Sequence, residues 1–165
     1  MAWTLPFPGR RASCALLIVA ALLSAPEAKS DVSAPYPGTQ TAKSKHAFDV
    51  LVERLERSIE GNRMGLVAQA SASRGAASRG VTIPGNAVFM VFRNDFAVRM
   101  LAASIPSGIE APIRIYVTEN ADGTASITYR IPSAVFAPYK NPELDAVARE
   151  LDPIFARIVR DALGD

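Results

Sequence analysis

The chain has 165 residues, with 18 Lys or Arg, 16 Asp or Glu, one His and one Cys. This length suits one domain with a single hydrophobic core. A single His and a single Cys exclude an internal disulfide and the zinc sites that need several such ligands. We therefore expect no metal and no cofactor.

The first 30 residues are predicted to be a signal peptide. Arg10 and Arg11 precede an apolar run over residues 12–23, and small residues follow it. A basic start, an apolar core and small residues before the cleavage point are typical of secretory signals. The run is shorter than the roughly 20 residues that cross a bilayer, so we expect cleavage after Ser30 and no membrane span afterwards.

The expected protein is therefore exported, either periplasmic or secreted. Twin-arginine export through Arg10-Arg11 stays open beside the general route. A lipoprotein is disfavoured, because a lipid-modified Cys follows the apolar run whereas Cys14 begins it. Removing residues 1–30 leaves 15 basic residues, 15 acidic residues and no cysteine. This neutral balance argues against nucleic acid as a partner, and the loss of Cys14 excludes thiol chemistry.

Residues 31–44 are predicted to be a flexible leader, because Pro35, Pro37 and Gly38 interrupt a run of small polar residues. An edge strand after Gly38 is the alternative. A single domain is expected over residues 45–165.

The domain is predicted to open with a helix that ends at Gly61-Asn62 and has Ser44 or Lys45 near its cap. Apolar residues recur there at helical spacing: Phe48, Leu51, Val52, Leu55 and Ile59.

A short strand is predicted over residues 64–70, and one helical turn between two loops over 71–80. Residues 87–92 are continuously apolar, which predicts a central strand buried on both faces. Asn94 is expected to cap a helix over 95–103.

The clearest pattern is a hairpin of strands over residues 112–119 and 124–131. Apolar and polar residues alternate in both strands, and Asp122-Gly123 suits the tight turn between them. Such alternation predicts an antiparallel sheet with one face buried.

The last helix is predicted to run from a cap at Asn141, with Pro142 in its first turn, to about Leu163. Pro153 lies inside it, which predicts a kink or a restarted helix capped by Asp152. Together the elements predict an α+β fold, an antiparallel sheet with helices packed on one face.

From about His46 to Phe136 this order of elements resembles a bacterial family, domain-of-unknown-function family 302. The shared features are the opening helix with its strand and Ala/Gly-rich segment, the strand AVFMVF before Asn94, Glu110-Ala111-Pro112 before the next strand, and the Asp122-Gly123 hairpin leading to Tyr129 and Pro132. The resemblance implies a small antiparallel-sheet fold with packed helices, broadly like the TATA-binding-protein class. It also makes a homodimer one of the expected partners, and it implies no reaction.

The chain departs from that family at two places. An Asp-His pair that is common in the family falls on Ser71 and Ala72, and the Gly and Pro that flank Asn94 there are Arg93 and Asp95 here. Any chemistry that used the Asp-His pair is therefore lost from this chain.

Three candidate sites have a simpler interpretation. His46 precedes the first helix, where a solvated residue is normal, and no partner for a catalytic triad is evident. Glu110 and Glu119 bracket a strand of roughly 30 Å, which is too long for shared acid–base work. The Arg-Gly pairs at 74–75 and 79–80 suggest an anion cradle, but their spacing is not that of a P-loop and a solvated loop is favoured.

The polar face of the hairpin is the most promising surface. Arg114, Tyr116, Thr128 and Arg130 are expected to project on one side of it, where two guanidinium groups and a ring suit an acidic ligand. Asn94, at the start of the second helix, completes this set of candidate binding residues. An ordinary solvated sheet face is the alternative.

The sequence therefore favours an exported, non-enzymatic domain that binds a ligand or a protein partner. The first alternative is a small enzyme that uses Asn94, Tyr129 and nearby carboxylates, which a deep pocket joining those residues would favour. The second alternative is a structural module that only dimerises. No catalytic residue is assigned.

Overall fold

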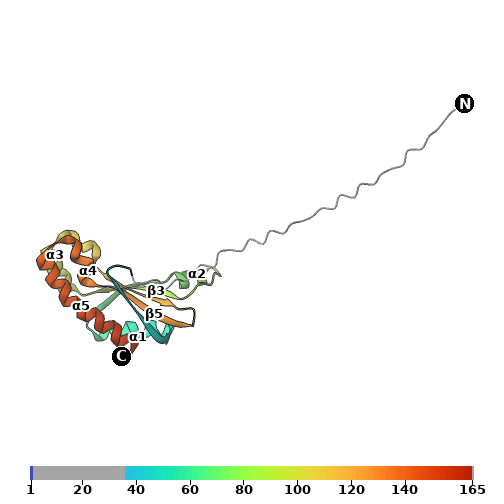
Figure 1. Cartoon of the computed structure of the whole chain (residues 1–165), viewed down its shortest axis with the longest axis horizontal. Coiled ribbons are helices and arrows are strands. Elements are labelled where there is room, and N and C mark those ends of the chain that lie inside the picture. The colour runs from blue at the N-terminus through green and yellow to red at the C-terminus, as the bar shows by residue number, and fades with distance from the viewer. Residues whose placement is uncertain (2–35, 165) are drawn as a thin grey trace. The chain divides into compact units, whose positions relative to one another are not determined.

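The computed structural model describes Met1 and residues 36–164 (Figure 1). The predicted signal peptide, apart from Met1, lies outside the described residues. Residues 36–164 contain an antiparallel sheet of five strands in the order β1-β5-β4-β3-β2. The strands are β1 (Thr39–Ala47), β2 (Gly65–Ala70), β3 (Asn86–Phe92), β4 (Ile113–Glu119) and β5 (Thr124–Arg130).

Helices α1, α3, α4 and α5 bury side chains in one core with the sheet. The first half of the long α5 lies beside α3 and α4, and its end lies beside α1 (Figure 1). Ser58 of α1 ties these two helices together, because its buried Oγ donates to the Ile158 carbonyl at 2.7 Å. In chain order the helices are α1 (Phe48–Gly61), α2 (Ala72–Ala77), α3 (Asn94–Ala103), the 3-10 helix η1 (Ile105–Glu110), α4 (Pro132–Phe136), the 3-10 helix η2 (Ala137–Tyr139) and α5 (Pro142–Leu163).

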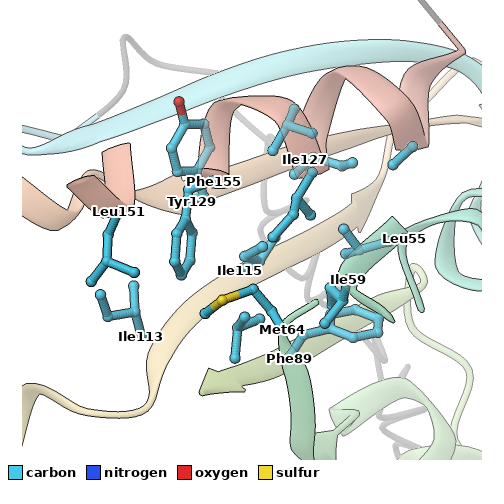
Figure 2. Close-up of a cluster of buried hydrophobic side chains, with 14 of the residues drawn as sticks. Leu55, Ile59, Met64, Phe89, Ile113, Ile115, Ile127, Tyr129, Leu151 and Phe155 are labelled. Carbon is cyan, nitrogen blue, oxygen red and sulfur yellow. The ribbon is translucent and has the colours of Figure 1, made fainter. Parts of the chain in front are cut away.

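The core lies between this helical layer and alternate residues of the strands. Phe89, Ile115 and Ile127 of three neighbouring strands are fully buried. Tyr129 lies beside Phe155 of α5, with ring centroids 6.4 Å apart, and its hydroxyl is directed toward β1 (Figure 2). Burying each large side chain of this kind contributes roughly 1.5–3 kcal/mol, so this face of the sheet is the main source of stability.

The α+β class, the antiparallel sheet and the packed helices are confirmed. The hairpin predicted over residues 112–119 and 124–131 is present as β4 and β5, within one residue at each end. The helical cap at Asn141 is also confirmed. Its Oδ1 accepts hydrogen bonds from the N–H groups of Glu143 at 2.9 Å and Leu144 at 3.1 Å.

The chain enters the sheet earlier than residue 45. β1 begins at Thr39 and pairs with β5 from Thr39 to Lys43 and again at Ala47, so residue 45, the expected start of the domain, lies inside a strand. This is the edge strand that the sequence offered as the alternative after Gly38. Its residues are mostly polar, and the apolar alternation that marks a strand is therefore weak. As a result α1 begins at Phe48, with Ala47 at its cap and no side-chain cap bond.

The prediction that residues 87–92 are buried on both faces is wrong. Ala87, Phe89 and Val91 are buried in the core, but Met90, which lies on the other face, is 36% exposed. The continuous apolar run therefore belongs to a strand with a covered side and an open side.

Two predicted helix caps, at Asp152 and Asn94, are also wrong. Of the two alternatives at Pro153, a kink or a restarted helix, the restart is excluded because α5 runs unbroken through this residue, and Asp152 accepts instead from the N–H of Ser133 at 2.9 Å. Asn94 is the first residue of α3 and caps nothing, since Arg93 occupies the cap position and no side-chain cap bond forms. Among the described helices, none combines the length and the apolarity needed to cross a membrane.

Candidate functional site

The sheet face turned away from the core carries the candidate site, and we call it the open face. Side chains alternate across a strand, so the pairing registers decide which residues share this face. It is made of Thr39, Thr41 and Lys43 of β1, Ser126, Thr128 and Arg130 of β5, Arg114, Tyr116 and Thr118 of β4, Asn86, Val88 and Met90 of β3, and Ala68 and Ala70 of β2.

Tyr116 stands near the middle of the open face. Its register partners are Thr128 on β5 and Val88 on β3. The ring is 39% exposed, and a hollow lies on each side of it. Tyr116 and Val88 line both hollows, so the two hollows are adjacent and share these two side chains as a wall.

The first hollow, which we call the basic hollow, lies over β1, β5 and β4 and has a volume of about 350 Å³. Two hydroxyl groups at its side are paired, with Oγ1 of Thr41 and Oγ1 of Thr128 at 2.8 Å. Both guanidinium groups of the hairpin belong to it. Its lining residues are Tyr36, Thr39, Val88, Arg114, Tyr116, Thr128, Tyr129 and Arg130.

The second hollow, which we call the apolar hollow, lies over β3 and β2 beside the start of α2 and has a volume of about 570 Å³. Its apolar lining consists of Ala70, Ala72, Val88 and the ring of Tyr116. Its polar lining residues are Ser71 and Asn86.

The charge on the open face has one sign. Its strand positions include Lys43, Arg114 and Arg130 but no Asp or Glu. The Nε of Arg130 is buried and has no hydrogen-bond partner within residues 36–164. Ion pairs of this part of the chain are formed by other arginines, namely Arg57–Glu53, Arg93–Asp95 and Arg99–Glu150. The basic hollow therefore presents two guanidinium groups that no described carboxylate pairs.

Four of the five residues predicted from the sequence line the basic hollow: Arg114, Tyr116, Thr128 and Arg130. Asn94 does not line it; this residue is exposed at the start of α3. Sequence reasoning missed Thr39 and Val88, because β1 was expected to be a leader and β3 to be buried on both sides. The register that brings them beside the hairpin is a long-range property.

The alternative site around Tyr129 has a different character. The Tyr129 side chain is in the core, 6% exposed, and its hydroxyl donates to Oε1 of Gln40 on β1. Burial raises the pKa of this hydroxyl, the negative charge of Asp152 raises it further, and Arg160 opposes the change. The hollow beside it is lined by β1 and α5 residues, and Asn94 is not among them. Because its pKa is raised, the Tyr129 hydroxyl stays protonated at neutral pH and cannot accept a proton as a general base. The geometry therefore favours a structural role for Tyr129.

The other sequence candidates are separated or already satisfied. Oε2 of Glu119 accepts from the Gly85 N–H at 2.7 Å, whereas Glu110 lies in η1 near the Tyr139 hydroxyl. The N–H groups of Gly75 and Gly80 are used in local backbone bonds, so they do not form an anion cradle. His46 is the exception: it is half-buried in β1, and its Nε2 is buried with no hydrogen-bond partner among residues 36–164. Within residues 36–164, no group of three His, Cys, Asp or Glu side chains is placed to hold a metal ion.

Comparison with known proteins identifies relatives of this fold. A family model described as "Domain of unknown function DUF302" matches residues 40–162. The crystal structure of an uncharacterised conserved DUF302 protein from Bacillus stearothermophilus superposes with a TM-score of 0.69 at 20% sequence identity, covering 76% of this chain and 98% of that one. The search of curated proteins found no match.

Proposed function

We propose that this chain, which belongs to the DUF302 family of unknown function, is a non-catalytic binding domain for an anionic ligand. One observation carries this proposal. Arg114 and Arg130 stand together in the basic hollow, and no carboxylate of the described chain pairs with either of them. Paired guanidinium groups in a hollow suit a carboxylate or phosphate.

The neighbours of these arginines fit the same ligand class. Thr39 and Thr128 line the basic hollow beside the guanidinium groups. Oγ1 of Thr39 donates to the Tyr36 carbonyl and Oγ1 of Thr128 is paired with Oγ1 of Thr41, so the two arginines remain the donors that a ligand meets. Tyr116 offers a flat ring on which an apolar or aromatic part of a ligand can lie. Nε of Arg130 is buried without a partner among residues 36–164, so an acceptor reaches it only when this side chain moves.

Titration with benzoate and with inorganic phosphate, followed by amide chemical shifts, tests the proposal. We expect the largest shifts at amides of β4 and β5 around Arg114, Tyr116 and Arg130. Arg130→Gln should weaken binding about fivefold, the factor that corresponds to about 1 kcal/mol. Arg157→Gln is the matched control, since Arg157 is an exposed arginine of α5 in the helical layer.

The two variants decide the outcome. If Arg157→Gln weakens binding as much as Arg130→Gln, the anion responds only to net charge and the proposal fails. Shifts confined to the helical layer, or no shifts at any anion concentration, would also overturn it.

We also propose that the domain acts outside the cytoplasm, on the basis of the apolar run and small residues in the first 30 positions. Expression of the full chain followed by N-terminal sequencing of the periplasmic and secreted fractions tests this. Asp31 should be the first residue recovered. A protein that keeps Met1 or stays in the cytoplasm would contradict export, and Arg10→Lys with Arg11→Lys separates twin-arginine export from the general route.

Self-association is the second candidate function, and one surface favours it. Four apolar side chains of α3 and η1 are exposed: Val98, Leu101, Ile105 and Ile109, the last two by 79% and 84%. A second copy of the chain would remove this apolar surface from water. Light scattering should then show a dimer that Ile105→Asp dissociates, whereas a monomer at all concentrations would contradict this function.

A further inference from the structure

The basic and apolar hollows of the open face differ in the groups that they offer to a ligand. In the apolar hollow, Oδ1 of Asn86 accepts from the Ala72 N–H at 2.9 Å, and its Nδ2 donates to the Pro84 carbonyl at 3.0 Å. Oγ of Ser71 accepts from the Arg74 N–H at 3.1 Å. The polar groups of this hollow are therefore engaged within the protein, and what it presents to a ligand is mainly apolar surface.

The two hollows lie in line across the sheet. The basic hollow is centred on β5 and β4, and the apolar hollow on β3 and β2, with Tyr116 and Val88 in both. Neighbouring strands are about 4.8 Å apart, so the path from Arg130 to Ala70 crosses three strand spacings, or roughly 14 Å. A ligand that fills both hollows is charged at one end and apolar over the rest of this length.

We propose that the ligand is a single-chain amphiphile, with a carboxylate head on Arg114 and Arg130 and a medium-length alkyl chain that crosses Val88 toward Ala70. This inference rests on the proposed function, because the head occupies the anion site described above. The tail adds a second requirement. The apolar hollow takes methylene groups out of water, and binding becomes tighter as the chain lengthens until the hollow is filled.

The charge of the open face favours a free amphiphile over a membrane surface. Lipid surfaces are typically bound by clusters of four to eight basic residues, whereas the strands of the open face carry Lys43, Arg114 and Arg130. Three basic side chains are enough to hold one carboxylate head and too few for a cluster of that kind.

Calorimetric titration of the purified protein with butyrate, octanoate and dodecanoate, each below its micelle concentration, tests the inference. Octanoate should bind at least tenfold more tightly than butyrate, because four added methylene groups are removed from water. Dodecanoate should gain less per methylene, since its end projects beyond the apolar hollow. Arg130→Gln should weaken all three ligands by a similar factor.

Val88→Thr tests the tail contact at nearly constant volume. It should weaken octanoate severalfold and butyrate much less, because Val88 lines both hollows but only the longer alkyl chain crosses it completely. Val67→Thr is the matched control: Val67 is a β2 valine, 54% exposed, that lines neither hollow. Ala70→Ser is a second tail variant at the far end of the path, should Val88→Thr disturb the sheet.

The outcomes separate this inference from the proposed function. If butyrate binds but octanoate is no tighter, or if the gain with chain length survives Val88→Thr and Ala70→Ser, the amphiphile is overturned while the anion site stands. If no carboxylate of any length binds, both fall. Arginine-dependent binding to phosphatidylglycerol vesicles without binding of monomeric octanoate would also overturn the inference, in favour of a lipid surface.

Discussion

At the residue scale, two asparagines with the same sequence signal have different roles. Both Asn94 and Asn141 precede a helical pattern and were predicted to be caps. Only Asn141 is one, with two N–H groups bound to its Oδ1, and its Nδ2 also donates to the Ala103 carbonyl at 2.9 Å. The signal is local, but the cap forms only where the chain enters the helix with the right geometry.

Asn141→Ala should lower the free energy of unfolding by about 1–2 kcal/mol, because helix N–H groups and the Ala103 carbonyl lose their partner. Asn94→Ala should change it by a few tenths of a kcal/mol, since Asn94 is exposed and makes no cap bond. Urea denaturation of both variants measures the difference. Equal losses would mean that Asn94 caps α3 after all.

At the element scale, one exposed ion pair joins α3 to α5. Arg99 binds Glu150 through two hydrogen bonds, at 2.6 and 2.8 Å, with side chains 48% and 50% exposed. The hydrogen bonds from Arg99 hold the pKa of Glu150 below its ordinary value. A carboxyl whose pKa is lower in the folded state stabilises the fold above its unfolded pKa and loses that contribution as the pH falls through the folded one.

Glu150→Gln should therefore lower the melting temperature slightly at neutral pH. The difference from the parent should shrink below the ordinary pKa of a glutamate and vanish once the pH is below the lowered pKa of Glu150 in the folded state. Thermal melts between pH 7 and pH 2 measure it, roughly over the range in which carboxyl groups titrate. Glu53→Gln is the control, because Glu53 meets Arg57 only at 3.8 Å with both side chains 68% exposed. A pH-independent difference for Glu150→Gln would show that the pair is not the cause.

The sequence predicted the elements whose signals are local. The β4–β5 hairpin follows from alternation around Asp122-Gly123, and α1 from its apolar stripe. Two predictions, for residues 87–92 and for a restart at Pro153, were wrong because they depend on tertiary packing. The run at residues 87–92 does not reveal which side a helix covers, and nothing local shows that α5 continues through Pro153. Burial of Leu151 and Phe155 on either side of that proline holds the helix together, and such packing is a tertiary effect.

At the scale of the whole molecule, strand order decides the candidate site. Arg114, Tyr116, Thr128 and Arg130 could be grouped from the sequence because alternate residues of a hairpin share a face. The apolar hollow could not, because it needs β3 and β2 placed next to β4 and the turn into α2 beside them. Thr39 likewise reaches the basic hollow only because the first strand of the chain pairs with the last.

That pairing of first and last strand gives a prediction about the extent of the folded unit. β1 covers the edge of β5, and its partly buried Ala42 packs against the core near Ile127. A chain that starts at residue 45 keeps only the last three residues of β1. It should therefore expose the backbone edge of β5 together with apolar side chains that are buried in the complete sheet.

We expect residues 36–165 to unfold cooperatively with the melting temperature of the longer chain, and residues 45–165 to aggregate or to melt without a cooperative transition. Circular dichroism and light scattering of the two truncations measure this. The shorter chain also lacks Tyr36 and Thr39 of the basic hollow, so loss of anion binding alone would not be informative. A stable, monomeric 45–165 would contradict the role of β1, because the other edge strand, β2, ends the sheet in both chains and is unchanged.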